Sequence, residues 1–292
     1  MGDPDLRLVR HFTVVAEHAH VGRAAEALHL AQPALSRQIR RLEAELGVVL
    51  LERHRHGVRL TAAGRVYLDR ARVLLELAST AQAEARAAAA PERLVVGHVA
   101  ALRVTPAVRA LRLERPDADV RTCHLAWNEP RAALLGGRVD AAVFRMPVPA
   151  EGLEIHHLGD EPRVLLVAAD HRLAARASVR LADLADEPMP QLPDPDPEWA
   201  AFWRVDPRPD GRPAPAGPAV ATPEDRLEAV AEGRAVALAT AAVLDGHLRS
   251  DLVAVPVEDL GPVAVVLGVR AGDRRPLLET FVRIARDRPV SP

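Results

Sequence analysis

The sequence predicts a multidomain protein with three successive regions: an all-α helix-turn-helix region with a β wing, a long linker helix, and an α/β region of two lobes. Three observations support this order. Apolar residues recur at helical spacing over residues 5–60, an alanine-rich heptad pattern follows over residues 61–90, and strand and helix patterns alternate from residue 92 onwards. With 292 residues, the chain is long enough for two or three cores.

Composition limits the classes of protein to which the chain can belong. Hydrophobic residues make up 49% and charged residues 27%, which is typical of a globular protein and not of a disordered or membrane protein. The sequence has neither a run of about 18 apolar residues nor a signal-peptide core, so we expect a cytoplasmic protein. The single cysteine, Cys123, excludes an internal disulfide and agrees with a reducing compartment.

Charge is distributed unevenly along the chain. Residues 1–90 hold 13 Arg against 10 Asp and Glu, a net charge of +3, whereas residues 91–292 hold 25 against 30, a net charge of −5. The N-terminal part is therefore the one that would face a polyanion, although +3 also fits an ordinary solvated surface. All 38 basic residues are arginine, which suits bidentate contacts to phosphate and guanine.

Residues 5–60 contain three short amphipathic helix patterns. Their apolar positions are Leu8, Phe12, Val15 and Ala16, then Ala24, Ala25 and Leu28, then Leu35, Ile39, Leu42 and Leu46. The link between the second and third patterns is only about His29 to Ala31. So short a link predicts the sharp crossing of a helix-turn-helix.

The third predicted helix has a polar side opposite its apolar stripe. At about 100° per residue, Pro33, Ser36, Arg37 and Arg40 lie on that side. Pro33 allows the helix to begin abruptly, with Gln32 at its tip. Gln can bond an adenine edge twice, Arg can do the same to guanine, and Ser can bond a phosphate or a base. This side is a candidate DNA-reading face, and a plain solvated surface is the alternative.

A two-stranded wing is predicted next. An apolar run over residues 48–51 and an alternating pattern that ends at Leu60 are separated by a charged turn that ends in Gly57. Arg53 and Arg55 at its tip would lie beside the backbone of bound DNA, and surface arginines without a partner are the alternative.

Residues 61–90 predict one long helix. Thr61 can cap its start and Pro91 stops it, so about 28 residues would span about 42 Å. Spacings of four and three residues alternate along Tyr67, Ala71, Leu74, Ala78, Ala81, Ala85 and Ala88. This is the pattern of a coiled-coil seam, so we expect a protruding dimerisation helix. A helix packed on its own domain is the alternative.

Residues 92–292 predict an α/β fold with a largely parallel sheet. Strands are expected over residues 94–97, 123–125, 141–144, 164–168, 236–239, 252–255 and 263–269. Helices are expected over residues 130–135, 224–232 and 276–285, and from Pro106 to Glu114 with Thr105 as the cap. Such a pattern suits two lobes with a cleft between them, the usual place for a small ligand.

Residues 187–218 are unusual because ten of them are proline, which excludes a regular helix or an inner strand. They nevertheless hold Trp199, Phe202 and Trp203, three of only eight aromatic residues. These three are expected either to wall the cleft or to pin a long loop to the second lobe.

Enzyme chemistry finds no support in the sequence. Pairs such as His156 and His157 lack the third ligand and the spacing of a zinc site. Cys123 and His124 are neighbours on a predicted strand, so they point to opposite faces and cannot act as nucleophile and base. We therefore expect no enzyme, no metal and no cofactor. An enzyme or solute-binding module in residues 92–292, tethered to DNA, remains the alternative.

The N-terminal segment resembles the LysR-type transcriptional regulators. The pattern is carried by Ala24, Ala25, Leu28, Gln32, Pro33, Ser36, Ile39, Leu42, Glu43, Leu46, Gly47, Leu50, Arg53, Leu60, Thr61 and Gly64. The segments LVVGHVA, LLGGRVDAAVF and DEPRVLLVAADHRLA are similar to the family as well, so the resemblance spans nearly the whole chain.

The resemblance implies three domains: a winged helix-turn-helix DNA-binding domain over residues 1–60, a dimerisation helix over residues 61–91, and an effector-binding domain over residues 92–292. The last would have two lobes like those of periplasmic binding proteins. Lobe I would comprise residues 92–161 and 268–292, and lobe II residues 162–267.

The function implied is transcription regulation by a homotetramer that bends double-stranded promoter DNA. A small-molecule effector between the lobes shifts the bend, which requires that it bind one arrangement more tightly than the other. An effector-independent DNA-binding protein is a further alternative.

The chain departs from the family at helix starts. The family usually has Ser, Phe and Thr where this chain has His20, Val21 and Gly22, so the capping hydroxyl of the second helix is missing. Ala31 replaces a second usual Ser. We expect each change to weaken a helix start by about 1 kcal/mol.

The resemblance also locates candidates for the effector site. Family members that bind carboxylates commonly have Ser or Thr after the first effector strand, where this chain has Val99, Ala100 and Ala101, so no hydroxyl clamp is expected there. The effector-binding candidates are Ala100, Ala101, Trp127, Asn128, Arg145 and Thr222. Thr222 would cap a helix whose N-terminus can hold an anion, although most such threonines only cap.

Overall fold

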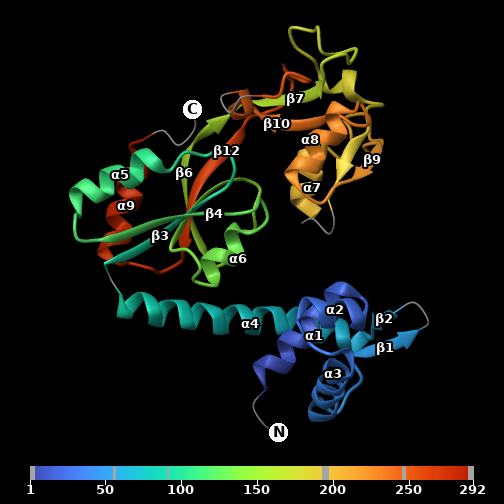
Figure 1. The fold of residues 1–292 in the computed structure, drawn as a ribbon, viewed down its shortest axis with the longest axis vertical. Coiled ribbons are helices and arrows are strands. Elements are labelled where there is room, and N and C mark those ends of the chain that lie inside the picture. Colours follow the sequence, from blue (N-terminus) through green and yellow to red (C-terminus); the bar gives the residue numbers. More distant parts are fainter. Residues whose placement is uncertain (1–3, 55–56, 91, 193–196, 245–247, 289–292) are drawn as a thin grey trace. The chain divides into compact units, whose positions relative to one another are not determined.

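The apolar stripes of residues 5–60 fold into three helices around one core, α1 (Leu6–His18), α2 (Val21–Ala27) and α3 (Gln32–Leu46) (Figure 1). Leu8, Phe12 and Leu35 are fully buried in it. In this computed structural model the described residues are 4–54, 57–90, 92–192, 197–244 and 248–288. They form two compact units, residues 1–85 and 86–292, and each is described by itself.

The helix starts differ in how they are capped. The His20 imidazole Nδ1 accepts hydrogen bonds from the amides of Gly22 (3.1 Å) and Arg23 (3.4 Å), so it replaces the missing hydroxyl at α2. The expected loss of that cap is therefore wrong. Ala31, the residue before α3, makes no side-chain cap, as expected. A neutral imidazole is a sufficient cap because it carries one acceptor nitrogen.

The predicted wing is present as the antiparallel strands β1 (Leu51–His54) and β2 (Gly57–Leu60). Its first strand is fixed to α3 because the Glu43 carboxylate accepts the amides of Leu50 (2.8 Å) and Leu51 (3.1 Å). Arg53 lies on β1 opposite Val58, whereas Arg55 falls outside the described residues.

The long helix α4 (Ala62–Ala89) begins where predicted, and the Thr61 hydroxyl accepts the amide of Gly64 at 2.8 Å. The predicted seam is wrong in its first half: Tyr67 and Ala71 are covered by their own unit, and the Tyr67 ring packs edge-on against Phe12. The large apolar side chains of α4 that remain exposed are Val66, Val73 and Leu77. They lie on a stripe displaced from the predicted one.

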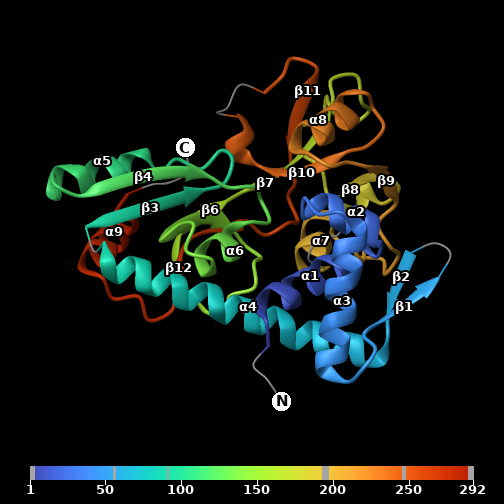
Figure 2. The same ribbon diagram turned by 60° about the horizontal axis from the view of Figure 1, so that its bottom comes forward.

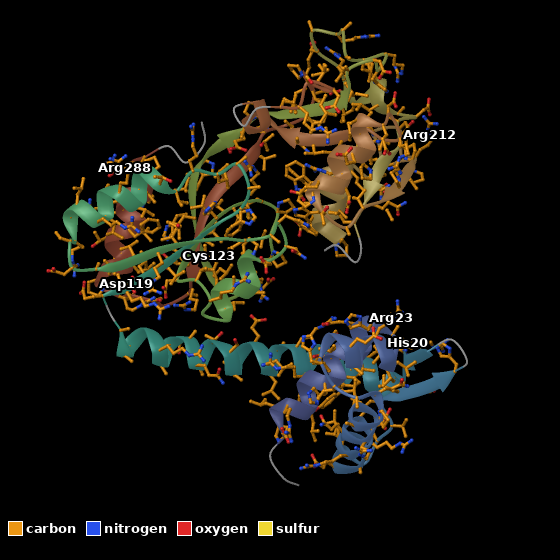
Figure 3. All side chains as sticks on the ribbon, in the orientation of Figure 1. His20, Arg23, Asp119, Cys123, Arg212 and Arg288 are labelled. Atoms are coloured by element: carbon orange, nitrogen blue, oxygen red, sulfur yellow. The ribbon has the colours of Figure 1, made fainter. Side chains whose placement is uncertain are left out.

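Unit 2 contains two main sheets. The larger has five strands, in the order β4-β3-β5-β12-β6. Its strands are β3 (Arg93–His98), β4 (Asp119–His124), β5 (Ala141–Arg145), β6 (Leu153–Glu161) and β12 (Val263–Arg270). Figure 3 labels Asp119 and Cys123 on β4. Strand β3 is parallel to β4 and β5, but β12 is antiparallel to β5 and β6, so the prediction of a largely parallel sheet is wrong.

Three helices cover this sheet: α5 (Thr105–Glu114), α6 (Pro130–Leu135) and α9 (Pro276–Arg286). Helices α5 and α9 pack on each other, and α6 packs on β5 and β12 (Figure 1). The predicted cap at Thr105 is wrong, because α5 already includes Thr105 and Val104 precedes it without a side-chain cap.

A second sheet of three antiparallel strands has the order β10-β7-β11. Its strands are β7 (Arg163–Ala168), β10 (Ala237–Thr240) and β11 (Leu252–Pro256), and α8 (Pro223–Ala231) packs on β7 (Figure 2). Short 3₁₀ helices cover Leu181–Leu184 and Ala241–Leu244. The chain leaves the first sheet at Pro162 and returns before Val263, so the return expected near residue 268 falls inside β12.

The proline-rich segment is more regular than predicted. It contains the helix α7 (Pro197–Arg204) and the parallel pair β8 (Met189–Gln191) and β9 (Ala216–Ala219). Pro197 opens α7 without loss of a hydrogen bond, since the first turn of a helix leaves its amides unpaired. The exclusion of helix from this segment is therefore wrong.

The described residues contain no helix long and apolar enough to cross a membrane. In the same part of the chain, no group of three or more His, Cys, Asp and Glu side chains is arranged to hold a metal ion.

Candidate functional site

The polar side of α3 lies on the surface of unit 1. Gln32, Pro33, Arg37 and Arg40 are exposed and Ser36 is half-buried. The opposite side of the helix carries the buried core residues, so the exposed row faces away from the protein's own interior. This arrangement leaves the predicted reading face accessible to a partner.

The arginines of α3 differ in their partners. Arg41 forms an ion pair with Glu45 one turn later, with Nε and Oε1 2.7 Å apart. Arg37 and Arg40 have no ion pair or hydrogen bond with any residue in the described part of the chain. Their guanidinium groups therefore keep all their donors for phosphate oxygens or base edges.

The start of α2 is tied to the turn before it. Arg23 donates from Nη2 to the carbonyl oxygen of His18 at 3.0 Å, on the same helix turn that His20 caps (Figure 3). Gln32 lies close to this cap, since a Cβ on Gly22 would come 3.6 Å from Gln32 Oε1. The first turn of α2 and the tip of α3 thus form one surface.

Arg145, an effector-site candidate, is fully engaged inside the protein. Its Nε and Nη2 donate to the two carboxylate oxygens of Glu161, at 2.7 and 3.2 Å, and its Nη1 donates to the carbonyl oxygen of Ala100 at 2.8 Å. Glu161 is only 3% exposed and directly precedes the crossing at Pro162. Arg145 therefore links β5, β6 and the turn after β3, and three of its five N–H donors are used inside the protein.

Thr222 is also used by the protein itself. Its hydroxyl accepts the amide of Asp225 at 3.0 Å, and the Asp225 carboxylate accepts the amide of Thr222 at 3.0 Å. Glu224 and Asp225 place two carboxylates in the first turn of α8, where they disfavour an anion. The capping alternative thus describes Thr222 better than a ligand role.

Of the remaining candidates, Trp127 takes part in a contact between the two sheet systems. Trp127, after β4, stacks on Trp199 of α7 with ring centroids 4.0 Å apart. Ala100, Ala101 and Asn128 are exposed, and Ala101 has a left-handed backbone with φ of 60°. The structure thus brings Trp127 to the aromatic residues of the proline-rich segment.

These aromatic residues continue as a row into the second lobe. Trp199 and Trp203 have ring centroids 5.9 Å apart, and Trp203 meets Phe202 edge-on at 5.5 Å. The Arg163 guanidinium lies over the Phe202 ring at 4.4 Å, and burial lowers its pKa from the ordinary value. The row therefore pins α7 to lobe II and also reaches Trp127 of the other lobe, whereas its role as a wall of the cleft stays a prediction.

A cavity of about 150 Å³ lies beside this row, between α7, β8, α8 and β10. Its lining includes Trp199 and Trp203, but also Arg204 and Arg226, which the sequence did not single out. In the sequence, Arg226 resembles any arginine on an amphipathic helix. Its position could not be recognised, because the cavity forms only where the proline-rich segment folds over the second sheet.

Two protein-family models match the chain. One, described as "Bacterial regulatory helix-turn-helix protein, lysR family", matches residues 6–65, and the other, "LysR substrate binding domain", matches residues 93–289. One match lies in each compact unit, and residues 66–92 between them are not matched.

Curated relatives agree with these models. The chain is 37% identical over 196 residues to the uncharacterized HTH-type transcriptional regulator YnfL of Escherichia coli, and 33% identical over 190 residues to AlsR of Bacillus subtilis. Both matches cover 63% of this chain but less than two thirds of the relatives, 64% and 63%. The Hca operon transcriptional activator HcaR of Escherichia coli is 29% identical over 98% of this chain and 99% of its own.

Solved structures match the whole length. CbnR complexed with its target DNA is 28% identical, with a TM-score of 0.51 over 97% of this chain and 99% of that one. Full-length BenM is 26% identical, with a TM-score of 0.55 over 97% and 96%.

Proposed function

Because the chain belongs to the LysR family of bacterial helix-turn-helix regulators, we propose that it is a ligand-responsive transcriptional regulator that reads double-stranded promoter DNA with α3. The observation that carries this proposal is the exposed side of α3, where Arg37 and Arg40 have no partner among the described residues. The relatives YnfL and HcaR are transcriptional regulators by name, and the solved structure of CbnR is a complex with its target DNA.

The proposed base contacts come from Gln32, Ser36, Arg37 and Arg40, with Pro33 at the start of the helix. A helix of this size fits the major groove, and its N-terminal residues are the ones that reach base edges in helix-turn-helix proteins. Arg53 and Arg55 of the wing are proposed to contact the DNA backbone. These roles divide the site into residues that select a sequence and residues that position the protein.

The regulatory part of the proposal concerns residues 92–292. We propose that they bind a small effector, that no chemical step follows, and that the protein is not an enzyme. Lobe I is proposed to comprise the five-stranded sheet with its helices, and lobe II residues 162 to about 262. Because the proposed target is chromosomal DNA, the proposed place of action is the cytoplasm.

The proposed assembly is a dimer through α4, and two such dimers in a tetramer. Val66, Val73 and Leu77 support it, because a row of exposed large apolar side chains on one helix is a common mark of a partner surface.

The test uses DNA ligands selected in vitro with the full-length protein. Arg37→Ala should weaken binding to the selected sequence by about 1–3 kcal/mol, a factor of about 5 to 150, because one bidentate base contact is lost. Binding to unrelated DNA should change much less. Fluorescence anisotropy at one fixed salt concentration measures both affinities.

Arg41→Ala is the matched control. It removes the same charge from the same helix, but from an arginine already paired with Glu45. It should keep the preference for the selected sequence. If Arg37→Ala keeps that preference while Arg41→Ala loses it, the assigned reading face is wrong.

A further inference from the structure

His20 and Gly22 share one small space at the start of α2. The His20 imidazole Nδ1 accepts the amides of Gly22 at 3.1 Å and Arg23 at 3.4 Å, so the ring lies against the first turn of the helix (Figure 3). A Cβ on Gly22 would come 3.0 Å from the Cε1 and 3.2 Å from the Nδ1 of His20, which is close enough to displace the ring. The imidazole can therefore cap α2 in this position because residue 22 carries no side chain.

The backbone that carries His20 is held from two sides. Ala19, which is left-handed with φ of 49°, accepts the amide of Val58 in the wing at 3.0 Å. Arg23 of α2 donates from Nη2 to the carbonyl oxygen of His18 in α1, also at 3.0 Å. The position of the imidazole is therefore set by α1, α2 and the wing together.

Gln32, at the tip of the proposed reading helix, borders the same space. The point where a Cβ on Gly22 would lie is 3.6 Å from Gln32 Oε1. The exposed Gln32 amide makes no hydrogen bond with any other described residue, so its direction depends on the surface of α2 beside it. A side chain that bonds one base in two places must be held in one direction.

We propose that His20 is a positioning residue of the DNA-reading surface: with Gly22 it fixes the first turn of α2, and through that turn it directs the Gln32 amide. The inference rests on the proposed function, because it requires that α3 reads DNA. It assigns part of the sequence preference to the start of α2 and not to α3 alone. It also makes residues 20 and 22 interdependent, two positions at which the chain departs from the family.

The link between a helix cap and DNA preference is a cost of ordering. Without the imidazole acceptor, the amides of Gly22 and Arg23 are left to water and the first turn of α2 frays. A selected sequence requires Gln32 in place, so binding to it must restore that turn. Unrelated DNA is bound mainly through its phosphates, and this contact does not need one direction of Gln32.

Two variants of His20 separate the cap from the size of the side chain. The amide oxygen of Asn is two bonds from Cβ, as Nδ1 of His is, whereas the amide oxygen of Gln is three bonds away. His20→Gln should lower the preference for the selected over unrelated DNA about fivefold, which corresponds to a cap of about 1 kcal/mol. His20→Asn should restore most of that preference. Fluorescence anisotropy of the full-length protein at one fixed salt concentration measures both affinities.

The matched control is His18→Gln. It makes the same exchange at the end of α1, where the half-buried imidazole has no hydrogen bond within the described part of the chain. It should keep the native preference.

A double-mutant cycle with Gln32→Ala tests whether His20 acts through Gln32. In the Gln32→Ala background, His20→Gln should change the preference by less than about twofold, because the side chain that it directs is gone. A cap that serves stability alone would give the same factor in both backgrounds.

A second cycle tests the shared space. Gly22→Thr should lower both the melting temperature and the DNA preference while His20 is present, because the new side chain displaces the imidazole. In the His20→Ser background, Gly22→Thr should cost neither, since a serine hydroxyl caps a helix without filling that space. Circular dichroism melts of the full-length variants accompany the anisotropy titrations.

Additive effects of His20→Gln and Gln32→Ala overturn the proposal, as does equal preference of His20→Asn and His20→Gln. Native melting and preference of Gly22→Thr also overturn it. If Arg37→Ala loses its preference as expected, any of these results removes only this inference. If Arg37→Ala keeps its preference while His20 and Gln32 are coupled, the role of Arg37 is removed and this inference stands. A native protein that selects no DNA sequence removes the proposed function and this inference with it.

Discussion

At the scale of single residues, two structural roles are filled by side chains that the sequence did not predict for them: a helix cap and a link between strands. His20 caps α2 with an imidazole nitrogen where a hydroxyl is usual, and Arg145 spends all three guanidinium nitrogens on Glu161 and Ala100. Neither partner could be read from the sequence. A helix cap involves residues close in sequence, so it is nearly predictable. The partner of Arg145 lies 16 residues later on β6, which β12 separates from β5 in the sheet.

His11 is a residue whose proton state affects stability. It is 8% exposed in α1, and burial lowers its pKa from the ordinary value of 6.5, an effect that the charges of Arg7 and Arg10 reinforce and the neighbouring Gln38 and Asp5 side chains oppose. The unfolded chain therefore takes up this proton at a higher pH than the folded chain. The contribution of His11 to stability is complete above its ordinary pKa and is lost as the pH falls below it.

His11→Gln should consequently reduce the pH dependence of folding. Between about pH 7.5 and 5.5, the melting temperature of the native protein should fall more than that of the variant. Circular dichroism melts of the full-length protein measure this difference. The exposed His157 provides the control, and His157→Gln should keep the native pH dependence. Parallel curves for the native protein and His11→Gln would contradict the assignment.

At the scale of elements, α4 shows how far a periodic pattern leads. The sequence gives the helix itself, its cap at Thr61 and its apolar spacing. It does not tell which stripe the protein's own core covers, because Tyr67 packs against Phe12 of a helix some 50 residues earlier. The stripe that stays exposed, and hence the proposed dimer surface, follows only from the folded unit.

Charge placed on that stripe should separate the proposed dimer. Val73→Glu combined with Leu77→Glu brings like charges together in a pair of α4 helices, so the α4 contact should be lost and the protein should sediment as a smaller assembly than the native protein at the same concentration. Analytical ultracentrifugation measures this. Leu113→Glu, at the most exposed leucine of α5, is the control. Dissociation by Leu113→Glu alone would move the interface to α5.

Two elements were missed by prediction because their local composition is not typical of a strand or a helix. β6 reads LEIHHLGDE, a polar segment at the edge of its sheet, and α7 lies between prolines. Strand direction in the two sheets was also missed. The chain leaves the first sheet at Pro162 and re-enters it as β12. On its return it lies between β5 and β6 and is antiparallel to both. Local composition carries no information about such a return.

At the scale of the whole molecule, the proposed regulation depends on the contact between Trp127 and Trp199 inside the effector domain. An offset aromatic pair contributes about 0.5–1.5 kcal/mol beyond its buried area. This is small beside the stability of a domain but comparable with the free energy by which ligands commonly bias two states. The contact is therefore strong enough to favour one arrangement and weak enough to be changed by a ligand.

A double-mutant cycle tests this contact. Trp127→Leu, Trp199→Leu and the double variant should give a coupling free energy of about 0.5–1.5 kcal/mol in urea unfolding followed by circular dichroism. The pair Trp127→Leu and Phe202→Leu is the control, since Trp127 meets Trp199 and Phe202 meets Trp203, and the two substituted rings do not pair with each other. A coupling near zero for Trp127 and Trp199 would show that the rings do not meet in solution.

The parallel pair β8 and β9, with α7 between them, belongs to one continuous stretch of chain folded onto lobe II. This stretch contributes most of the cavity wall, whereas the Arg145 and Glu161 link that braces the crossing lies outside it. The cavity wall and the link at the crossing are thus encoded in separate stretches of the gene. A change within a few dozen codons can therefore reshape the cavity and leave the Arg145 and Glu161 link intact.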